Sequence, residues 1–241
     1  LRGKKISMIF QEPMTSLNPL MTIGNQISEL LHRHFKMTNK EINEKAKNIL
    51  DLVQIPDSKR WLNGYPHEMS GGMRQRVMIA MALVCEPTVL IADEPTTALD
   101  VTTQAQILAL LNNLQKKMGT SIVMITHDLG VISETADHVI VMYAGEKVEE
   151  ANVQDLFKNP KHPYTQGLMK AIPNLDKISK SKGKPDRLEE IKGIVPSLHD
   201  LPVGCSFANR CLYAMDKCKK ENPAFEKKGK NHWASCFKEF K

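Results

Sequence analysis

Long apolar runs are missing from this sequence, and so is the pattern of a secretory signal. A membrane-spanning helix needs roughly 18 or more successive apolar residues, and no stretch of the 241 residues reaches that length. The chain opens with Leu1-Arg2-Gly3 and without an initiating Met, so we expect a segment of a longer protein. With 41% hydrophobic and 25% charged residues, the composition is that of a globular protein with one core and room for a small second module.

Cysteine is nearly missing from the first three quarters of the chain, where Cys85 stands alone. Excess charge is missing there too, because residues 1–175 hold 18 Lys/Arg and 18 Asp/Glu. The rest of the chain holds 15 and 9, which accounts for the whole net charge of +6, together with four cysteines. A basic segment can contact nucleic acid, anionic lipid or an acidic partner, although a solvated surface is the simpler interpretation. This joint change in composition predicts two domains, residues 1–160 and residues 161–241.

Apolar stretches of two kinds alternate along the first domain. Short continuous runs predict strands at residues 5–10, Val89–Ala92, Ser121–Ile125 and His138–Tyr143, with the middle two buried. Helical spacing of apolar residues predicts helices over Ile23–Phe35, Lys40–Ile55 (capped by Asn39), Met73–Val84, Thr102–Met118 and Leu129–Ala136. This alternation predicts an α/β fold with a parallel sheet and helices on its faces. Gly145 predicts a hairpin after the last strand, and the polar stretch Ile178–Asp186 predicts a linker.

The predicted strand Val89–Ala92 ends in two adjacent carboxylates, Asp93 and Glu94. An unpaired charge is costly inside a sheet, so both belong at the strand's carboxyl end, where parallel sheets bind ligands. Adjacent residues of an extended chain point in opposite directions. One carboxylate could therefore face a metal ion that bridges phosphate oxygens, and the other could activate a water. A pair of acids in a solvated turn has the same pattern, so this motif alone leaves both interpretations open.

Two further motifs also allow both a functional and a purely structural interpretation. Ser70-Gly71-Gly72 precedes a predicted helix, and glycine amides at a helix N-terminus can bind an anion. A serine N-cap followed by a plain loop explains the same residues. His127 follows the strand Ser121–Ile125, so it can lie beside the two acids and bond a terminal phosphate, although a lone histidine there is usually a surface residue.

Together and in this order, the motifs resemble the ATPase subunits of ABC transporters. The resemblance covers roughly residues 1–145 and rests on IFQEP (Gln11), MSGGM (Ser70, Gly71, Gly72), ADE (Asp93, Glu94), TALD (Asp100) and ITHD (His127). It implies a P-loop-NTPase-like parallel sheet with a helical subdomain at about residues 23–85. It also implies that the protein binds ATP and Mg²⁺.

The resemblance assigns a role to each matched residue. Asp93 would hold Mg²⁺, Glu94 would be the general base, and His127 would contact the terminal phosphate. Gln11 would report that phosphate to a membrane subunit, and Asp100 would line a dimer interface. The remaining matched residues would bind ATP held by a facing second subunit: Ser70, Gly71 and Gly72. Where the family usually has Gln after the glycines, this chain has Met73, which we expect to cost one polar contact.

A narrower resemblance points to the dipeptide/oligopeptide importer branch. It rests on IFQEPMTSLNP, IADEPTTALDVTTQAQIL, HPYTQGLMKAIP and the tail with LPVGCSFANRC. It implies ATP hydrolysis that energises peptide import from a peripheral position on the cytoplasmic face of the membrane. The implied partners are a second ABC ATPase subunit, integral membrane permease subunits and, indirectly, an external peptide-binding protein, with no nucleic acid.

The phosphate-binding loop of this family, G-x-x-x-x-G-K-S/T, is missing from the sequence. The Gly-Lys pairs at Gly3, Gly183 and Gly229 lack the first glycine at the required offset and lack Ser or Thr after the Lys. In the family this loop precedes the glutamine motif, so we expect an N-terminal truncation and an incomplete fold. We also expect the chain alone to bind ATP weakly and to hydrolyse essentially none.

The four late cysteines are spaced C-x5-C, C-x6-C and C-x17-C. Zinc sites usually have tighter pairs, whereas iron–sulfur sites use four thiolates at more varied spacing. Some members of the importer branch carry a 4Fe-4S cluster on a similar tail. We therefore expect 4Fe-4S, with zinc as second choice and free thiols as third, on Cys205, Cys211, Cys218 and Cys236, and we expect Cys85 to be a core residue.

Two rival interpretations remain at this point. The basic tail favours a non-transport ABC ATPase of DNA repair or translation, but the single set of motifs and the importer-like tail argue against it. The missing phosphate loop favours a non-functional remnant.

Overall fold

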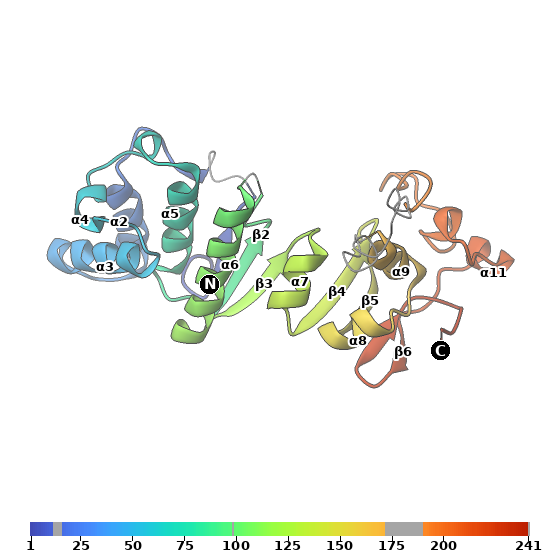
Figure 1. Cartoon of the computed structure of the whole chain (residues 1–241). Helices are drawn as coiled ribbons and strands as arrows, with labels where there is room; N and C mark the ends of the chain where they lie inside the picture. The colour runs from blue at the N-terminus through green and yellow to red at the C-terminus, as the bar shows by residue number, and fades with distance from the viewer. Residues whose placement is uncertain (12–15, 98, 172–189, 241) are drawn as a thin grey trace, which may run out of the picture. The chain divides into compact units, whose positions relative to one another are not determined.

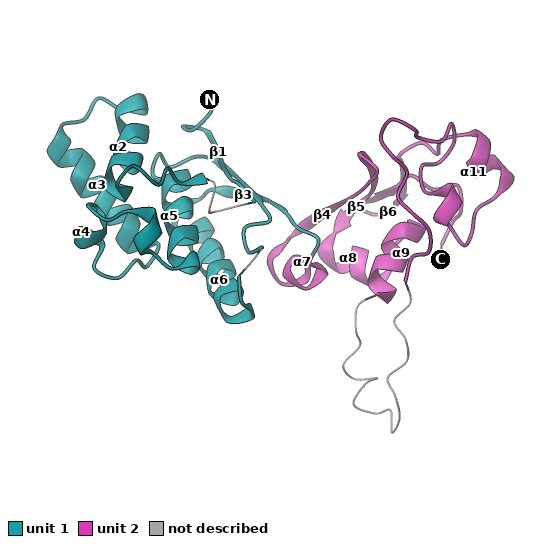
Figure 2. Cartoon of the chain, turned by 90° about the horizontal axis from the view of Figure 1, so that it is seen from above, with its two compact units in different colours: residues 1–127 teal, residues 128–241 magenta. Residues whose placement is uncertain are grey.

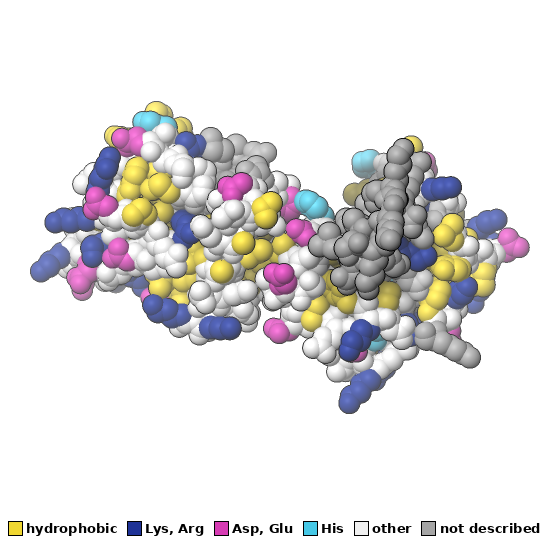
Figure 3. Space-filling view, viewed as in Figure 1, with side chains coloured by type: hydrophobic (Ala, Val, Ile, Leu, Met, Phe, Trp, Pro, Cys, Tyr) yellow, Lys and Arg dark blue, Asp and Glu magenta, His cyan; other side chains and the backbone are white. Residues whose placement is uncertain are grey.

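A computed structural model describes residues 1–11, 16–97, 99–171 and 190–240 (Figure 1). The chain forms two compact units, residues 1–127 and residues 128–241, which are described separately (Figure 2). In the described part of the chain, no helix is both long enough and apolar enough to cross a membrane. Lys and Arg side chains are scattered among Asp and Glu over the visible surface of each unit (Figure 3).

The first unit is built on a parallel sheet of three strands in the order β1-β2-β3. These strands are β1 (Ile6–Ile9), β2 (Val89–Asp93) and β3 (Ser121–Ile125). All three were predicted from their apolar runs, and all three end at the same edge because they run in parallel. The sheet therefore brings together the residues that follow Ile9, Ala92 and Ile125.

Two helices cover one face of this sheet, α5 (Gly71–Leu83) and α6 (Val101–Met118). The side chains of Ile9, Leu90 and Ala92 are buried against them. Side chains of a strand alternate between faces, so only Ile122 and Met124 of β3 pack on this core.

The opposite face of the sheet is open to solvent at β3. Val123 is 52% exposed and Ile125 is 49% exposed. The prediction that Ser121–Ile125 is a fully buried strand is therefore wrong, because its apolar residues divide between a packed face and an exposed one.

The helical part of the first unit lies between β1 and β2 in the sequence. It comprises α2 (Ile23–His34), α3 (Asn39–Leu52), the short α4 (Ser58–Trp61) and a 3-10 turn (Pro66–Glu68). Helix α3 begins with a capping box, in which Thr38 Oγ1 accepts from the Glu41 amide and the Glu41 carboxylate accepts from the Thr38 amide. The cap is thus Thr38 and not Asn39, which is the first helical residue.

The second unit contains an antiparallel sheet in the order β4-β5-β7-β6. Its strands are β4 (His138–Tyr143), β5 (Glu146–Asn152), β6 (Glu226–Gly229) and β7 (His232–Ala234). The predicted hairpin joins β4 to β5 through Ala144 and Gly145, whose φ angles of 48° and 81° match a two-residue type I′ turn. Strand β4 was predicted correctly, but it belongs to this second sheet and does not extend the parallel one.

Short helices and turns complete the second unit: α7 (Leu129–Thr135), α8 (Val153–Lys158), α9 (Pro163–Lys170), α11 (Asp216–Lys220) and a 3-10 turn (Ala208–Arg210). The predicted linker Ile178–Asp186 lies outside the described residues. The predicted domain boundary after residue 160 falls within this unit, where β5 pairs with β7, and it stays a prediction.

Candidate functional site

The candidate site begins where β2 ends. Asp93 is the last residue of the strand, and Glu94 leaves it with a φ angle of 43°. A non-glycine residue in this left-handed region is uncommon, and such backbone strain is concentrated at functional sites. The Glu94 amide donates to the carbonyl of Ile125 over 2.9 Å, so the neighbouring strand holds the turn in place.

Three side chains converge on the Glu94 carboxylate. Gln11 Nε2 donates to Oε2 over 2.9 Å, and Thr97 Oγ1 donates to the same oxygen over 2.8 Å. His127 Nδ1 lies 2.8 Å from Oε1. Gln11 follows β1 and His127 follows β3, so the shared edge of the parallel sheet brings together the three residues that sequence analysis singled out.

These contacts favour the ionised form of Glu94. The bond from His127, followed by those from Thr97 and Gln11, holds the pKa of the Glu94 carboxyl below its ordinary value. Glu94 is therefore an ionised acceptor at neutral pH. Because an ionised carboxylate only accepts hydrogen bonds, the proton in this contact belongs to His127 Nδ1, which leaves Nε2 for another partner. The His127 side chain is 80% exposed, so a ligand can reach that nitrogen.

Asp93, the other carboxylate of the ADE motif, also lies at this edge. Its carboxylate takes no part in the hydrogen bonds around Glu94. Within the described residues, no group of three or more His, Cys, Asp or Glu side chains is placed to hold a metal ion. Mg²⁺ does not need such a group, because it usually binds through one or two carboxylates, with water and phosphate oxygens as the other ligands. A single carboxylate at the carboxyl end of a parallel strand therefore fits Mg²⁺ bound together with a nucleotide.

The start of α5 holds the Ser-Gly-Gly motif. Ser70 caps the helix, since its Oγ accepts from the Met73 amide over 3.3 Å. A Cβ at Gly72 would lie 2.9 Å from Thr103 Cγ2, so glycine allows α5 to approach α6 closely. A Cβ at Gly71 would meet nothing within 4 Å, so this side of the helix start is open. The N-terminus of α5 thus offers unoccupied space to an anion.

Asp100 has a defined local contact as well. Its Oδ1 accepts from the Thr103 amide over 2.9 Å and its Oδ2 from Thr103 Oγ1 over 2.6 Å, which makes it the N-cap of α6. These bonds hold the pKa of Asp100 below its ordinary value. Thr103 therefore touches both Asp100 and the start of α5, so the TALD and SGG motifs lie side by side.

Two residues that sequence analysis did not select take part in the site. Thr97 bonds Glu94 directly, as described above. Gln75 of α5 is 1% exposed and donates Nε2 to the carbonyl of Pro95, which links the SGG helix to the turn after Glu94. Thr97 is the first residue of the TALD motif, which could have identified it; Gln75 lies between two arginines and carried no comparable signal.

The four late cysteines gather around one small cavity in the second unit. The Cys205 amide donates to the carbonyl of Cys218 over 2.8 Å, and a Cβ at Gly204 would lie 2.2 Å from that oxygen, so glycine is required for the approach. Burial raises the pKa of the Cys236 thiol to about 11, with a smaller contribution from the other thiols. The four sulfur atoms are not placed as metal ligands in the described residues. Cys85 is buried in the core of the first unit, as predicted.

Comparison with known proteins finds a matching family for a part of each unit. Residues 1–97 match the family "ABC transporter", and residues 148–218 match the family "Oligopeptide/dipeptide transporter, C-terminal region". The "Probable peptide ABC transporter ATP-binding protein y4tR" of Sinorhizobium fredii is 54% identical over 238 residues, which are 99% of this chain and 70% of that protein. The "Oligopeptide transport ATP-binding protein AppD" of Bacillus subtilis is 54% identical over 237 residues, which are 98% of this chain and 70% of that protein.

Solved structures with the same fold are ABC cassettes. A dimeric post-hydrolysis state of the cassette MJ0796 with ADP and Pi has a TM-score of 0.54 and 32% identity, covering 62% of this chain and 63% of that one. CbiO1 from Clostridium perfringens has a TM-score of 0.57 and 32% identity, covering 64% of this chain and 59% of that one. The chain thus spans less than two thirds of either cassette. The predicted α/β fold with a parallel sheet and a helical subdomain is confirmed, and the chain belongs to the ATPase subunits of ABC transporters, in the oligopeptide/dipeptide importer branch.

Proposed function

We propose that this chain belongs to the ATP-hydrolysing subunit that energises the import of peptides across the cytoplasmic membrane, and that the chain alone, which lacks the phosphate-binding loop, hydrolyses essentially no ATP. The observation that supports it most directly is the Glu94 carboxylate, held ionised by Gln11 and His127 at the end of a parallel sheet. The relatives with 54% identity are named as peptide transport ATP-binding proteins. The protein acts as a peripheral subunit on the cytoplasmic face of the membrane.

The subunit works with other proteins and not with nucleic acid. Its partners are a second ABC ATPase subunit, integral membrane permease subunits and, indirectly, an external peptide-binding protein. Dimeric cassettes among the similar structures support the first of these. The open start of α5 supports it as well, because a nucleotide held by a facing subunit can reach the amides of Gly71 and Gly72.

The residues at the carboxyl edge of the sheet divide the chemistry among them. Glu94 orients the attacking water and accepts its proton, which requires the ionised form that its neighbours stabilise. His127 can donate a hydrogen bond from Nε2 to the terminal phosphate when that nitrogen carries a proton; with Nδ1–H kept on Glu94, both ring nitrogens are then donors. Gln11 donates to the same carboxylate. When the terminal phosphate displaces this hydrogen bond, Gln11 moves and so signals the bound phosphate to the permease.

The negative charge of the nucleotide would be balanced by a Mg²⁺ held at Asp93 and by the helix N-terminus of the facing subunit. Asp93 would hold Mg²⁺, which when bound would supply positive charge beside the transferring phosphoryl group. Ser70 accepts from the Met73 amide, and its own O–H remains a donor for a phosphate oxygen. Asp100, which caps α6 beside this helix start, lines the same dimer interface.

The cysteine module holds a 4Fe-4S cluster in this proposal, with Cys205, Cys211, Cys218 and Cys236 as ligands. All four line one cavity, and burial raises the thiol pKa of Cys205, Cys211 and Cys236, which disfavours their thiolates when no cation is bound. The side chains must rotate toward one another to reach ligand positions. Iron and sulfide assays on anaerobically purified protein test this: four irons and four sulfides per chain are expected, whereas one zinc per chain or no metal contradicts the cluster.

Peptide uptake by cells tests the main proposal. In a strain whose own gene carries Glu94→Gln, we expect uptake of a labelled tripeptide to fall about 100-fold or more, because loss of a general base typically costs 10²–10⁴. Glu134→Gln is the matched control, since Glu134 is an exposed glutamate of α7, and it should leave uptake unchanged. Uptake at the normal rate with Glu94→Gln would contradict the proposal.

A further inference from the structure

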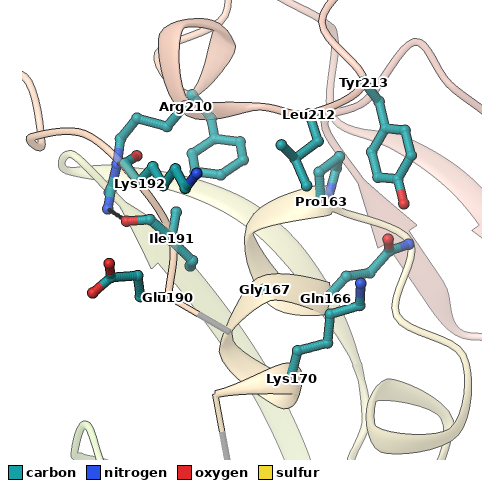
Figure 4. A pocket seen from close by; sticks show the side chains of 11 residues that line it. Pro163, Gln166, Gly167, Lys170, Glu190, Ile191, Lys192, Arg210, Leu212 and Tyr213 are labelled. Atoms are coloured by element: carbon teal, nitrogen blue, oxygen red, sulfur yellow. Dashed lines mark hydrogen bonds between the residues drawn. The ribbon is translucent and has the colours of Figure 1, made fainter. Parts of the chain in front are cut away.

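The second unit contains a cavity of about 470 Å³ that the proposed function does not use (Figure 4). This volume lies in the range of small-molecule sites, which are mostly apolar with a few polar groups. Its apolar lining comes from α9 and from two later segments: Pro163, Ile191, Phe207, Leu212 and Tyr213.

The wall of the cavity is held in place by specific packing. A Cβ at Gly167 would lie 2.7 Å from Ile191 Cγ1, so the glycine lets Ile191 rest directly on α9. Arg210 donates Nη2 to the carbonyl of Ile191 over 2.9 Å and Nε to that of Lys192 over 3.1 Å (Figure 4). Its Nη1 donates to the Tyr143 hydroxyl over 3.3 Å. The Arg210 guanidinium thus ties residues 191–192 to β4.

Charged groups surround the apolar lining unequally. Lys170 comes from α9 and Lys192 from residues 190–192, and Glu190 is the single acid among the lining residues that the structure describes. Gln166 donates Nε2 to the carbonyl of Pro160 over 3.0 Å, which leaves its Oε1 as an acceptor. The ammonium group of Lys192 beside an apolar surface suits a ligand with an apolar body and a negatively charged end.

We propose that this cavity binds a small amphipathic carboxylate, with the apolar body against Ile191 and Phe207 and the carboxylate at Lys192. Two sources share this chemistry, a short apolar peptide and a medium-chain fatty acid. A peptide would add N–H groups that can donate to Gln166 Oε1, whereas a fatty acid would not.

Calorimetric titration of the full chain tests the proposal without nucleotide, so its outcome is independent of the ATPase function. The probes are leucyl-leucine, octanoate and leucyl-leucine amide. We expect at least one carboxylate to bind with 1:1 stoichiometry and the amide to bind at least tenfold more weakly than its parent dipeptide if the dipeptide is the ligand. Stronger binding of leucyl-leucine identifies the peptide source, and stronger binding of octanoate identifies the fatty acid.

Two variants locate the binding. Lys192→Glu should weaken binding about tenfold or more, while Lys230→Glu, at an equally exposed lysine outside the cavity, should not. Leu212→Trp should block the cavity without unfolding the chain, because Leu212 is 86% exposed. Absence of binding by both carboxylates, or unchanged binding in both Lys192→Glu and Leu212→Trp, would overturn the proposal.

Discussion

At the scale of single residues, His162 makes the stability of the second unit depend on pH. The side chain is 2% exposed and its Nδ1 accepts from the Tyr164 amide over 3.1 Å. Burial lowers the pKa of His162 from 6.5 to about 4. Between these values the unfolded chain binds a proton that the folded chain excludes, so stability is full above pH 6.5 and declines as the pH falls toward 4.

His162→Asn should remove this dependence. A shift of this size corresponds to about 3 kcal/mol between pH 6.5 and pH 4. Asparagine still caps a helix but does not titrate, so the variant should lose less stability than the wild type over this range. Guanidinium unfolding at pH 7 and at pH 4.5 measures the difference. Equal losses in the two proteins would assign the pH dependence to other groups.

The sequence identified the Glu94 site better than it identified the site's supporting residues. Glu94 and His127 follow apolar strands, so their placement at one edge follows from a parallel sheet alone. Thr97 and Gln75 act through contacts that depend on how a turn folds and how α5 packs. Such contacts are set by tertiary structure, which periodicity and motif spacing do not report.

At the scale of elements, two helices of the first unit begin with the same kind of cap but have different neighbours. Ser70 caps α5 and Thr38 caps α3, each through a 3.3 Å bond from an amide three residues later. Replacing either by Ala should cost roughly 1 kcal/mol of stability. The proposed function predicts that only Ser70→Ala also lowers peptide uptake, because this variant has no hydroxyl at position 70 to donate to a phosphate.

Thermal unfolding and uptake measured together separate these effects. Similar melting temperatures for the two variants, with reduced uptake only in Ser70→Ala, are the expected result. If Thr38→Ala reduces uptake as strongly, the loss reflects helix stability and not phosphate contact.

The sequence predicted which helices and strands are present more readily than it predicted what they pack against. The four longer predicted helices, the short predicted helix α7 and the strands of the first unit are present within a few residues of their predicted bounds. Strand β3 is half exposed because only one face of its sheet is covered by α5 and α6. Strands β6 and β7 were not predicted, because they are three or four residues long and are defined by pairing with β5.

At the scale of the whole molecule, one buried carboxylate joins distant parts of the second unit. Glu149 of β5 is fully buried and accepts from the amides of Lys161 and His162 and from His232 Nε2, over 2.5, 2.9 and 2.6 Å. His232 belongs to β7, so this carboxylate connects the β4–β5 hairpin, the start of α9 and the last strand pair. A sequence-only boundary after residue 160 separates these partners, because nothing in the local pattern indicates that β7 returns to β5.

Glu149→Ala should therefore destabilise the second unit by about 3–5 kcal/mol, since it leaves two amides and an imidazole buried without their acceptor. Glu150→Ala is the matched control. Glu150 is the next residue on the strand and pairs at the surface with His138 and Lys147, so its loss should cost about 1 kcal/mol or less. Hydrogen exchange resolves the two units: protection should fall in residues 128–241 of Glu149→Ala and remain unchanged in residues 1–127. Equal losses in both variants, or an equal loss in both units, would show that Glu149 is not what holds this unit's strands together.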